Sequence, residues 1–128
     1  MKKDYTGLIH NSMYHQCQER GYATVVDVFM DIGILDRKKY EDWRKGKIRY
    51  LESVCMINLH KLSGFLAIMR KYASKNGLKP SYTFYRQWGA KRKIQLRFSK
   101  SGQGYIERLY ATHYVKSKSG TGTEDKKQ

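Results

Sequence analysis

The fold of the C-terminal part of this chain depends on residues 92–115, RKIQLRFSKSGQGYIERLYATHYV. Within KIQLRFS (93–99), Ile94, Leu96 and Phe98 alternate with polar residues, which predicts a strand with one buried and one exposed face. The following SKSGQG lacks the pattern Gly-x-x-x-x-Gly-Lys-Ser/Thr of a nucleotide-binding loop. We therefore interpret SKSGQG as a chain reversal in which both glycines supply positive φ angles.

Two structures fit the return segment YIERLYATHYV, residues 105–115. Its Tyr, Ile, Thr and Val content favours a strand. Periodicity does not decide on so short a segment, because a helical stripe also fits, through Ile106, Leu109, Tyr110, His113 and Tyr114. We prefer the strand, since residues 93–99 need a pairing partner and a hairpin provides one.

The first half of the chain predicts short helices separated by caps and glycines. The stop signals are Gly21, Gly33 and Gly46, and the start signals are Asp36 and a capping box of Thr24 with Asp27. The predicted helices cover residues 8–20, a second stretch with the apolar face Val25, Val28, Phe29 and Ile32, a third that holds Tyr40 and Trp43, and residues 49–57.

The clearest helix follows Asn58, in NLHKLSGFLAIMRKYASKNG. Its apolar residues recur at helical spacing and form one stripe, which consists of Leu59, Leu62, Phe65, Leu66, Met69 and Tyr72. Asn76-Gly77 is a strong stop signal. Pro80 and Ser81 both suit a helix start, so YTFYRQW predicts a short further helix that ends at Gly89.

These elements predict a mostly helical α+β fold of five or six helices with a C-terminal strand or β-hairpin, similar to a winged helix. One domain is expected over residues 1–116, and the Gly/Ser-rich residues 117–128 are expected to form a flexible polar tail. No apolar run reaches the length of a membrane helix, and the two cysteines do not form a C-x-x-C pair. The expected location is the cytoplasm.

The formal net charge of +15 is unevenly distributed along the chain. Residues 1–36 carry three basic and five acidic residues, net −2; residues 37–78 carry 11 and three, net +8; residues 79–118 carry ten and one, net +9. A solvated basic surface is the plain explanation of such a charge. The concentration of bases away from the acids favours a protein that binds the phosphate backbone of nucleic acid.

Residues 69–89, MRKYASKNGLKPSYTFYRQWG, resemble the helix-turn-helix motif. Ala73, Gly77 and Leu78 occupy the positions of its small residue, turn glycine and following apolar residue, although the turn with Pro80 is longer than usual. The resemblance implies a second helix in the major groove, where Arg and Gln side chains read guanine and adenine edges. The predicted hairpin would then be a wing against the phosphates.

The predicted nucleic-acid-binding residues form three groups. The short helix contributes Tyr82, Tyr85, Arg86 and Gln87; the wing contributes Lys91, Arg92, Lys93, Arg97 and Lys100; and the run after the third helix contributes Arg44, Lys45, Lys47 and Arg49. Phe84 and Trp88 are expected to pack on the core instead. Because exposed tyrosines beside arginines also stack on unpaired RNA bases, RNA stays an alternative to the preferred duplex DNA.

Metal-binding and catalytic patterns are weak. His10, His15 and Cys17 do not match a zinc module, and the separation of acids from bases argues against a metal-dependent nuclease. No metal and no cofactor are expected. Acid–base catalysis by His113, Tyr110 and Arg108, as in a metal-free ribonuclease, is the enzymatic alternative, but a non-enzymatic protein is preferred.

The expected function is that of a small, basic, bacterial-type DNA-binding protein. The competing class is a protein-interaction module: an inhibitor or accessory subunit of a nucleoprotein complex, such as one from a mobile element or a defence system. A membrane partner is not expected.

Overall fold

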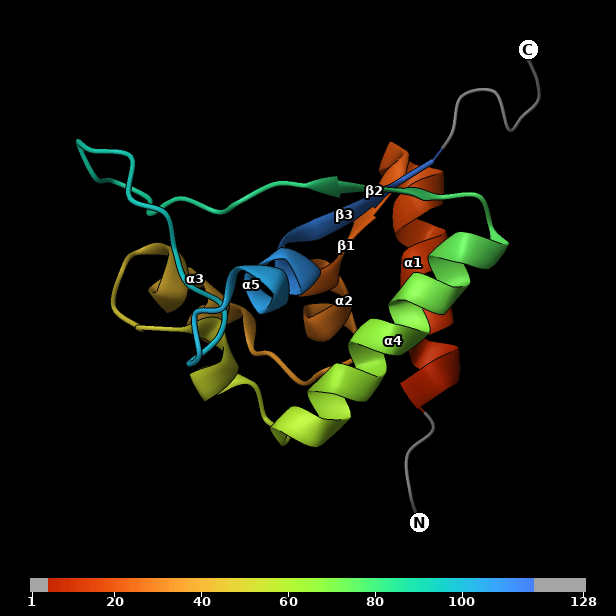
Figure 1. The fold of residues 1–128 in the computed structure, drawn as a ribbon, viewed down its shortest axis with the longest axis horizontal. Helices are drawn as coiled ribbons and strands as arrows, with labels where there is room; N and C mark the ends of the chain where they lie inside the picture. Colours follow the sequence, from red (N-terminus) through yellow and green to blue (C-terminus); the bar gives the residue numbers. More distant parts are fainter. Residues whose placement is uncertain (1–4, 117–128) are drawn as a thin grey trace.

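A computed structural model describes residues 5–116, which form a mostly helical α+β fold, as the sequence predicts (Figure 1). The elements of this part of the chain are α1 (Tyr5–Arg20), β1 (Tyr22–Thr24), α2 (Val25–Asp31), α3 (Arg37–Arg44), the 3₁₀ turn η1 (Leu51–Val54), α4 (Leu59–Lys75), β2 (Lys79–Tyr82), α5 (Gly104–Ala111) and β3 (Thr112–Val115). The predicted tail, 117–128, lies outside the described residues. None of the helices within residues 5–116 has the length and apolar character that a membrane crossing requires.

The capping box of Thr24 with Asp27 is confirmed, whereas Asp36 precedes α3 without a side-chain capping hydrogen bond. The amide of Asp27 donates to Thr24 Oγ1 at 3.0 Å, and the Thr24 hydroxyl donates to Asp27 Oδ2 at 2.8 Å, so this pair starts α2 directly after the short strand β1. Asn58 starts α4 in the same way, by accepting from the amide of Lys61 at 2.9 Å. The apolar stripe of α4 is turned inward, except that its first residue, Leu59, is 58% exposed.

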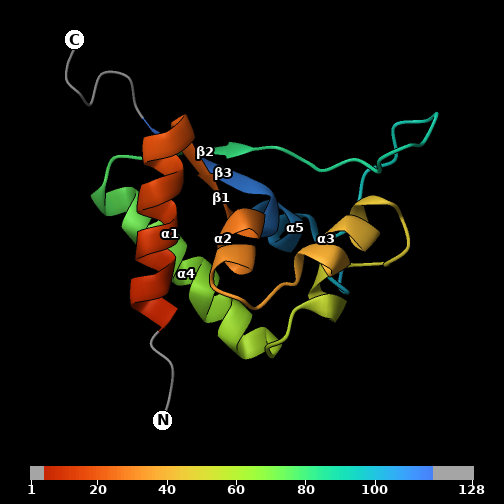
Figure 2. The same ribbon diagram turned by 180° about the vertical axis from the view of Figure 1, so that it is seen from behind.

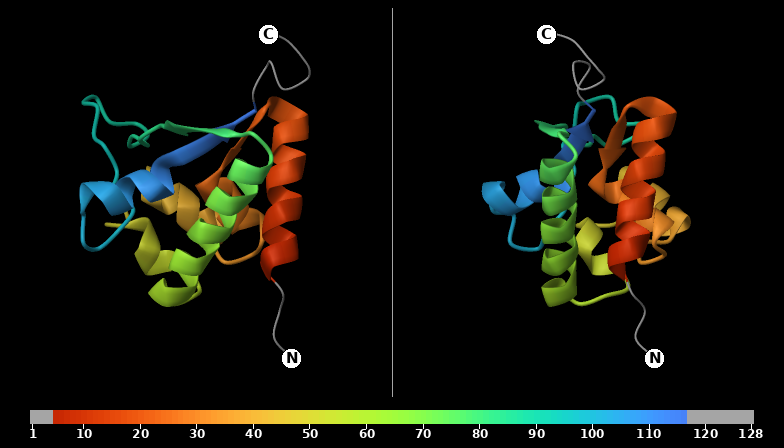
Figure 3. Two further views of the ribbon diagram at one scale, coloured as in Figure 1. Left: turned by 45° about the vertical axis from the view of Figure 1, so that its right-hand side comes forward. Right: turned by 90° about the vertical axis from the view of Figure 1, so that its right-hand side faces the viewer.

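The sheet places β3 between β1 and β2, with both pairs antiparallel. Helices α1 and α4 pack side by side next to this sheet (Figures 1 and 3). Within β3, Thr112 and Tyr114 are buried while Val115 is exposed, which is the alternation expected of a strand with one covered face. The last strand of the chain therefore joins segments that lie far apart in the sequence.

The prediction for residues 105–115 is wrong in its preferred form, because the segment is half helix and half strand. Residues 104–111 form α5, whose helical stripe includes the buried Tyr110, and residues 112–115 form β3. The strand part does not pair with residues 93–99. It fills the gap between β1 and β2, where its Thr, Tyr and Val find partners on both sides.

The short helix predicted from Pro80 onward is also wrong, so the helix-turn-helix arrangement lacks its second helix. Residues 79–82 form β2, in which Pro80 pairs with Tyr114 and Ser81 with His113. Pro80 is tolerated because β2 is an edge strand, where its missing N–H breaks no second ladder. The Tyr- and Phe-rich residues that follow continue in extended form, in line with their β propensity.

Residues 49–57 contain a short 3₁₀ turn rather than the predicted helix. The amides of Leu51 and Glu52 donate to the carbonyls of Arg97 and Phe98, at 3.3 and 2.9 Å. The amide of Met56 donates to the carbonyl of Ile34 at 2.7 Å, so it is not available for the bond to the Glu52 carbonyl that a continuous helix would need.

An aromatic cluster connects the helices to residues 83–98. The fully buried ring of Trp43 lies 5.1 Å from Phe98 and 5.6 Å from Tyr85, and its Nε1 donates to the carbonyl of Arg97 at 2.8 Å. Phe98 in turn stacks on Tyr110 of α5 at 5.8 Å. The buried rings of Trp43, Phe98 and Tyr110 meet at one point and anchor residues 83–98 to α3 and α5.

Candidate nucleic-acid interface

Residues 83–98 form an extended arm of two antiparallel segments that are joined by a single isolated β-bridge, and we call it the hairpin arm. The amide of Gln87 donates to the Ile94 carbonyl and that of Leu96 to the Tyr85 carbonyl, both at 2.8 Å. An antiparallel bridge between residues 86 and 95 lies between these bonds. The arm extends away from the helices and ends in the loop 88–93 (Figures 1 and 2). A hairpin is therefore present, but residues 93–99 pair with the preceding segment instead of the following one.

The tip of the hairpin arm carries exposed cations. Lys91, Arg92 and Lys93 are exposed within the loop, and Arg86 is exposed on the strand that leads into it. Ile94, predicted to face the core, is 42% exposed because it lies beside the tip rather than over the aromatic cluster. Leu96 and Phe98, further down the same strand, are buried as predicted.

A second basic segment, residues 44–50, lies against the hairpin arm. The amide of Trp88 donates to the Arg44 carbonyl at 2.7 Å, and a parallel bridge joins Tyr50 to Arg97. These contacts join exposed cations from two parts of the sequence into one group, which we call the basic surface: Lys45, Lys47, Arg49, Arg86, Lys91, Arg92 and Lys93. Neither residues 44–50 nor residues 83–98 contain an Asp or Glu.

Two further residues of the predicted interface contact other parts of the chain, although Arg97 is itself exposed. Arg97 Nη2 donates to the carbonyls of Ser99 and Lys100 at 3.1 and 2.6 Å, and its guanidinium lies 5.3 Å from the ring centre of Tyr50. Gln87 is half-buried, and its amide fills the space beside Gly46 so closely that a Cβ there would meet its Oε1 at 2.5 Å. Both side chains therefore hold the loops around the arm in place.

The aromatic residues of the predicted interface have different environments. Tyr85 packs between Trp43, Phe98 and His113, and burial raises the pKa of its hydroxyl well above the usual range. Trp88 is 44% exposed, but its ring is covered by the Arg44 guanidinium at 4.9 Å. Tyr82, which is also part of the predicted interface, is 55% exposed. The expectation that Phe84 and Trp88 pack on the core is wrong, because Phe84 is 39% exposed and Trp88 lies under the Arg44 guanidinium instead.

The start of the SKSGQG loop is hydrogen-bonded to a carboxylate of the same chain, that of Glu107. The buried Glu107 accepts from the amides of Phe98 and Ser99 at 2.9 and 2.7 Å, and from the Ser99 hydroxyl at 2.5 Å. Gly102 has the expected positive φ of +70°, whereas Gly104 is simply the first residue of α5. The amides of Phe98 and Ser99, which could otherwise bind an anion, are therefore already hydrogen-bonded to Glu107. Lys100 lies next to them in the sequence; its amide donates to Glu52 at 2.9 Å and its side chain is exposed.

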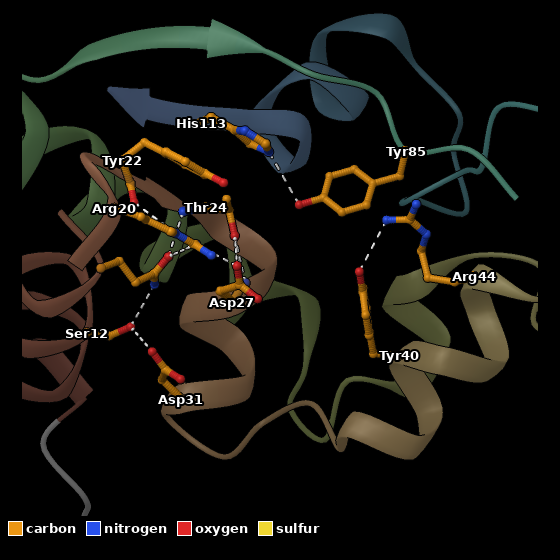
Figure 4. A network of polar contacts seen from close by, with 11 residues as sticks. Ser12, Arg20, Tyr22, Thr24, Asp27, Asp31, Tyr40, Arg44, Tyr85 and His113 are labelled. Atoms are coloured by element: carbon orange, nitrogen blue, oxygen red, sulfur yellow. Dashed lines mark hydrogen bonds and ion pairs between the residues drawn. The ribbon is translucent and has the colours of Figure 1, made fainter. Parts of the chain in front are cut away.

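A polar cleft lies at the base of the hairpin arm, and sequence reasoning missed it (Figure 4). Its volume is about 230 Å³, and its walls come from five different elements and the arm, through Arg20, Tyr22, Thr24, Asp27, Arg44, Thr83, Phe84, Tyr85 and His113. Only the Thr24–Asp27 capping box marks it in the sequence. No local pattern reveals a site whose residues meet only after the sheet has formed.

The interior of the cleft is organised by one ion pair and one histidine. Arg20 Nη2 lies 2.7 Å from Asp27 Oδ2. His113 stacks on Tyr22 at 5.7 Å and has its Nε2 3.4 Å from the Tyr85 hydroxyl. Burial lowers the pKa of His113 and the nearby Arg20 charge lowers it further, while Asp27 opposes the shift.

The residues predicted for ribonuclease chemistry have separate partners. Tyr110 donates its hydroxyl to Glu52 at 2.7 Å, whereas His113 faces the cleft and Arg108 is exposed on α5. Among the suggested metal ligands, His10 packs on Tyr72, His15 on Tyr14, and Cys17 is buried. Within residues 5–116, no three His, Cys, Asp or Glu side chains are grouped so that they could hold a metal ion.

No protein-family model, no curated protein and no solved structure matches this chain. Its function therefore has to be inferred from its own residues.

Proposed function

We propose that this protein binds duplex DNA through the basic surface, without catalysing a reaction. The observation that supports the proposal is the contact between residues 44–50 and the hairpin arm, because it brings together two segments that carry seven exposed cations between them. Lysine and arginine side chains on such a surface neutralise phosphates and release the counterions condensed on them. Since neither segment contains a carboxylate, no charge of the same segments opposes the phosphates.

Two features favour a duplex over an unpaired strand. Binding to unpaired bases depends on free aromatic faces. Beside the basic surface, Tyr85 packs on Trp43 and one face of Trp88 is covered by Arg44, whereas the exposed rings of Tyr82 and Phe84 lie at the base of the arm, away from its tip. The hairpin arm, in contrast, consists of two antiparallel segments joined by one bridge, and the major groove of B-DNA admits an element of two strands. In this arrangement the hairpin arm takes the part of a wing, and the contacts go mainly to phosphates, so we expect weak sequence preference.

The direct test is a binding titration by fluorescence anisotropy. The probes are two labelled DNA duplexes of unrelated sequence, one single-stranded DNA and one RNA duplex, each at two salt concentrations. We expect both DNA duplexes to bind with similar affinity, and more tightly than the other probes. Undetectable binding of every probe at about 50 mM salt, where phosphate contacts are strong, would contradict the proposal.

Variants separate DNA binding from the alternatives. Arg86→Gln removes one exposed cation of the hairpin arm, and Lys71→Gln removes an exposed cation of α4, the helix that packs against α1 (Figures 1 and 2). Only Arg86→Gln is expected to weaken DNA binding. Tighter binding of the RNA duplex would instead support an RNA-binding protein. Stoichiometric recovery of one protein from nuclease-treated lysate, together with no affinity for DNA, would support an accessory subunit.

A further inference from the structure

The polar cleft at the base of the hairpin arm contains an arginine whose charge is not matched by a carboxylate. Among residues 5–116, the ion pairs are Arg20–Asp27 and Lys38–Asp42, so Arg44 takes part in neither. Its Nε is buried without a hydrogen-bond partner, and its Nη1 donates only to a neutral group, the Tyr40 hydroxyl, at 3.2 Å. A half-buried charge without an ionic partner is costly unless a ligand supplies one.

Aromatic rings hold this guanidinium in a fixed orientation. The Arg44 Cζ lies 4.9 Å from the ring centres of both Tyr85 and Trp88, and 5.9 Å from that of Tyr40. Rings stabilise the cation through their faces but leave the N–H groups at its edge without acceptors. A planar, pre-oriented guanidinium is suited to an oxyanion, because its fork donates two parallel hydrogen bonds to two oxygens.

The other residues of the cleft make it a site for an anion rather than a cation. The Asp27 carboxylate is already engaged by Arg20 Nη2 at 2.7 Å and by the Thr24 hydroxyl at 2.8 Å. With Arg44 added, the formal charge of the lining is therefore positive. The hydroxyls of Thr83 and Tyr85 and the ring of His113 line the same cleft and supply neutral hydrogen-bonding groups.

The size of the cleft limits its ligand. Its volume of about 230 Å³ is below the range of about 300–1,000 Å³ that is usual for sites of whole organic ligands. We propose that the cleft binds a single phosphate group, with Arg44 as the main charge partner. The phosphate comes either from nucleic acid held on the basic surface, since residues 83–85 belong to both the arm and the cleft, or from a free phosphate compound. The first source rests on the proposed function, and the second does not.

The test follows the resonance of Arg44 itself. In a ¹H–¹⁵N correlation spectrum of the full chain, inorganic phosphate is titrated at constant ionic strength, with chloride as the matched control. We expect saturable shifts of the Arg44 Nε–H signal and of the amides of residues 83–85 with phosphate but not with chloride. The proposal would be overturned if neither inorganic phosphate nor a short DNA duplex produced a saturable shift of the Arg44 signal, or if the shifts were confined to the exposed cations of residues 91–93 with both probes.

Variants and a second probe distinguish the two phosphate sources. Arg44→Lys keeps the charge but loses the fork, and we expect phosphate affinity to fall by at least about tenfold. Lys71→Gln is the control and is expected to leave phosphate affinity unchanged. Should Arg44→Lys not fold, the titration of the unmodified chain still decides. Wild-type phosphate shifts that persist in Lys91→Gln/Arg92→Gln/Lys93→Gln support a free phosphate ligand. Arg44 shifts produced only by a short DNA duplex, and lost in that variant, support a backbone phosphate.

Discussion

Neutralising the tip of the hairpin arm is the most informative perturbation of the basic surface. Lys91→Gln/Arg92→Gln/Lys93→Gln removes three of seven exposed cations while leaving the aromatic cluster and the two ladder bonds of the arm untouched. Since these side chains are exposed, the fold is expected to keep its stability within about 0.5 kcal/mol. Any change in DNA affinity then reports on charge.

The magnitude follows from the number of phosphate contacts. If each cation of the basic surface neutralises one phosphate, seven contacts give a slope of log K against log salt of about −6, and four contacts give about −4. Extrapolated from about 1 M salt, three lost contacts lower the affinity about 500-fold at about 0.1 M salt and about 80-fold at about 0.2 M.

The assay is an anisotropy titration of one labelled duplex at four or more salt concentrations, for the wild type and the triple variant. The matched control is Lys71→Gln/Lys75→Gln, which removes two exposed cations from α4. We expect the control to keep the wild-type slope. A triple variant with an unchanged slope would refute the assignment of the arm to DNA binding, even if its affinity were lower.

Three further predictions concern the fold around the site. Glu107→Gln replaces a carboxylate that accepts three hydrogen bonds by an amide with only one oxygen. Urea denaturation is expected to show a free energy of unfolding lower by about 2–3 kcal/mol at an unchanged m-value. A decrease of less than about 0.5 kcal/mol would contradict this role of Glu107. Thr24→Ala removes the cap of α2 and is expected to cost about 1 kcal/mol, whereas Thr24→Ser, which keeps the hydroxyl, should recover most of it. Burial holds the pKa of His113 in the folded state below the ordinary histidine value of about 6.5, so the unfolded chain binds the proton more readily and stability should fall as the pH drops below about 6.5. His113→Asn should flatten this part of the pH profile of stability, and a variant with an unchanged profile would show that His113 is not the titrating group.

Local signals in the sequence identified most of the helices correctly. The Thr24–Asp27 box and Asn58 start helices, and the apolar stripe of residues 59–75 faces the core, because caps and helical periodicity depend only on residues a few positions apart. The same signals misled at Pro80, which suits a helix start and an edge strand equally well. Only the pairing with β3 selects the strand.

For the candidate sites, too, some features follow from the sequence and others only from the tertiary structure. The sequence by itself determined the helical class of the fold and the excess of cations in residues 37–118, because composition and short-range periodicity are properties of the chain. The tertiary structure alone decided that residues 44–50 lie beside the hairpin arm, that the Arg97 guanidinium lies over the ring of Tyr50, and that Arg44 lines a cleft with Arg20 and His113. These outcomes depend on hydrogen bonds and ring contacts between residues tens of positions apart. Tertiary contacts of this kind override the local helix and strand propensities, which are the only preferences that a single sequence displays.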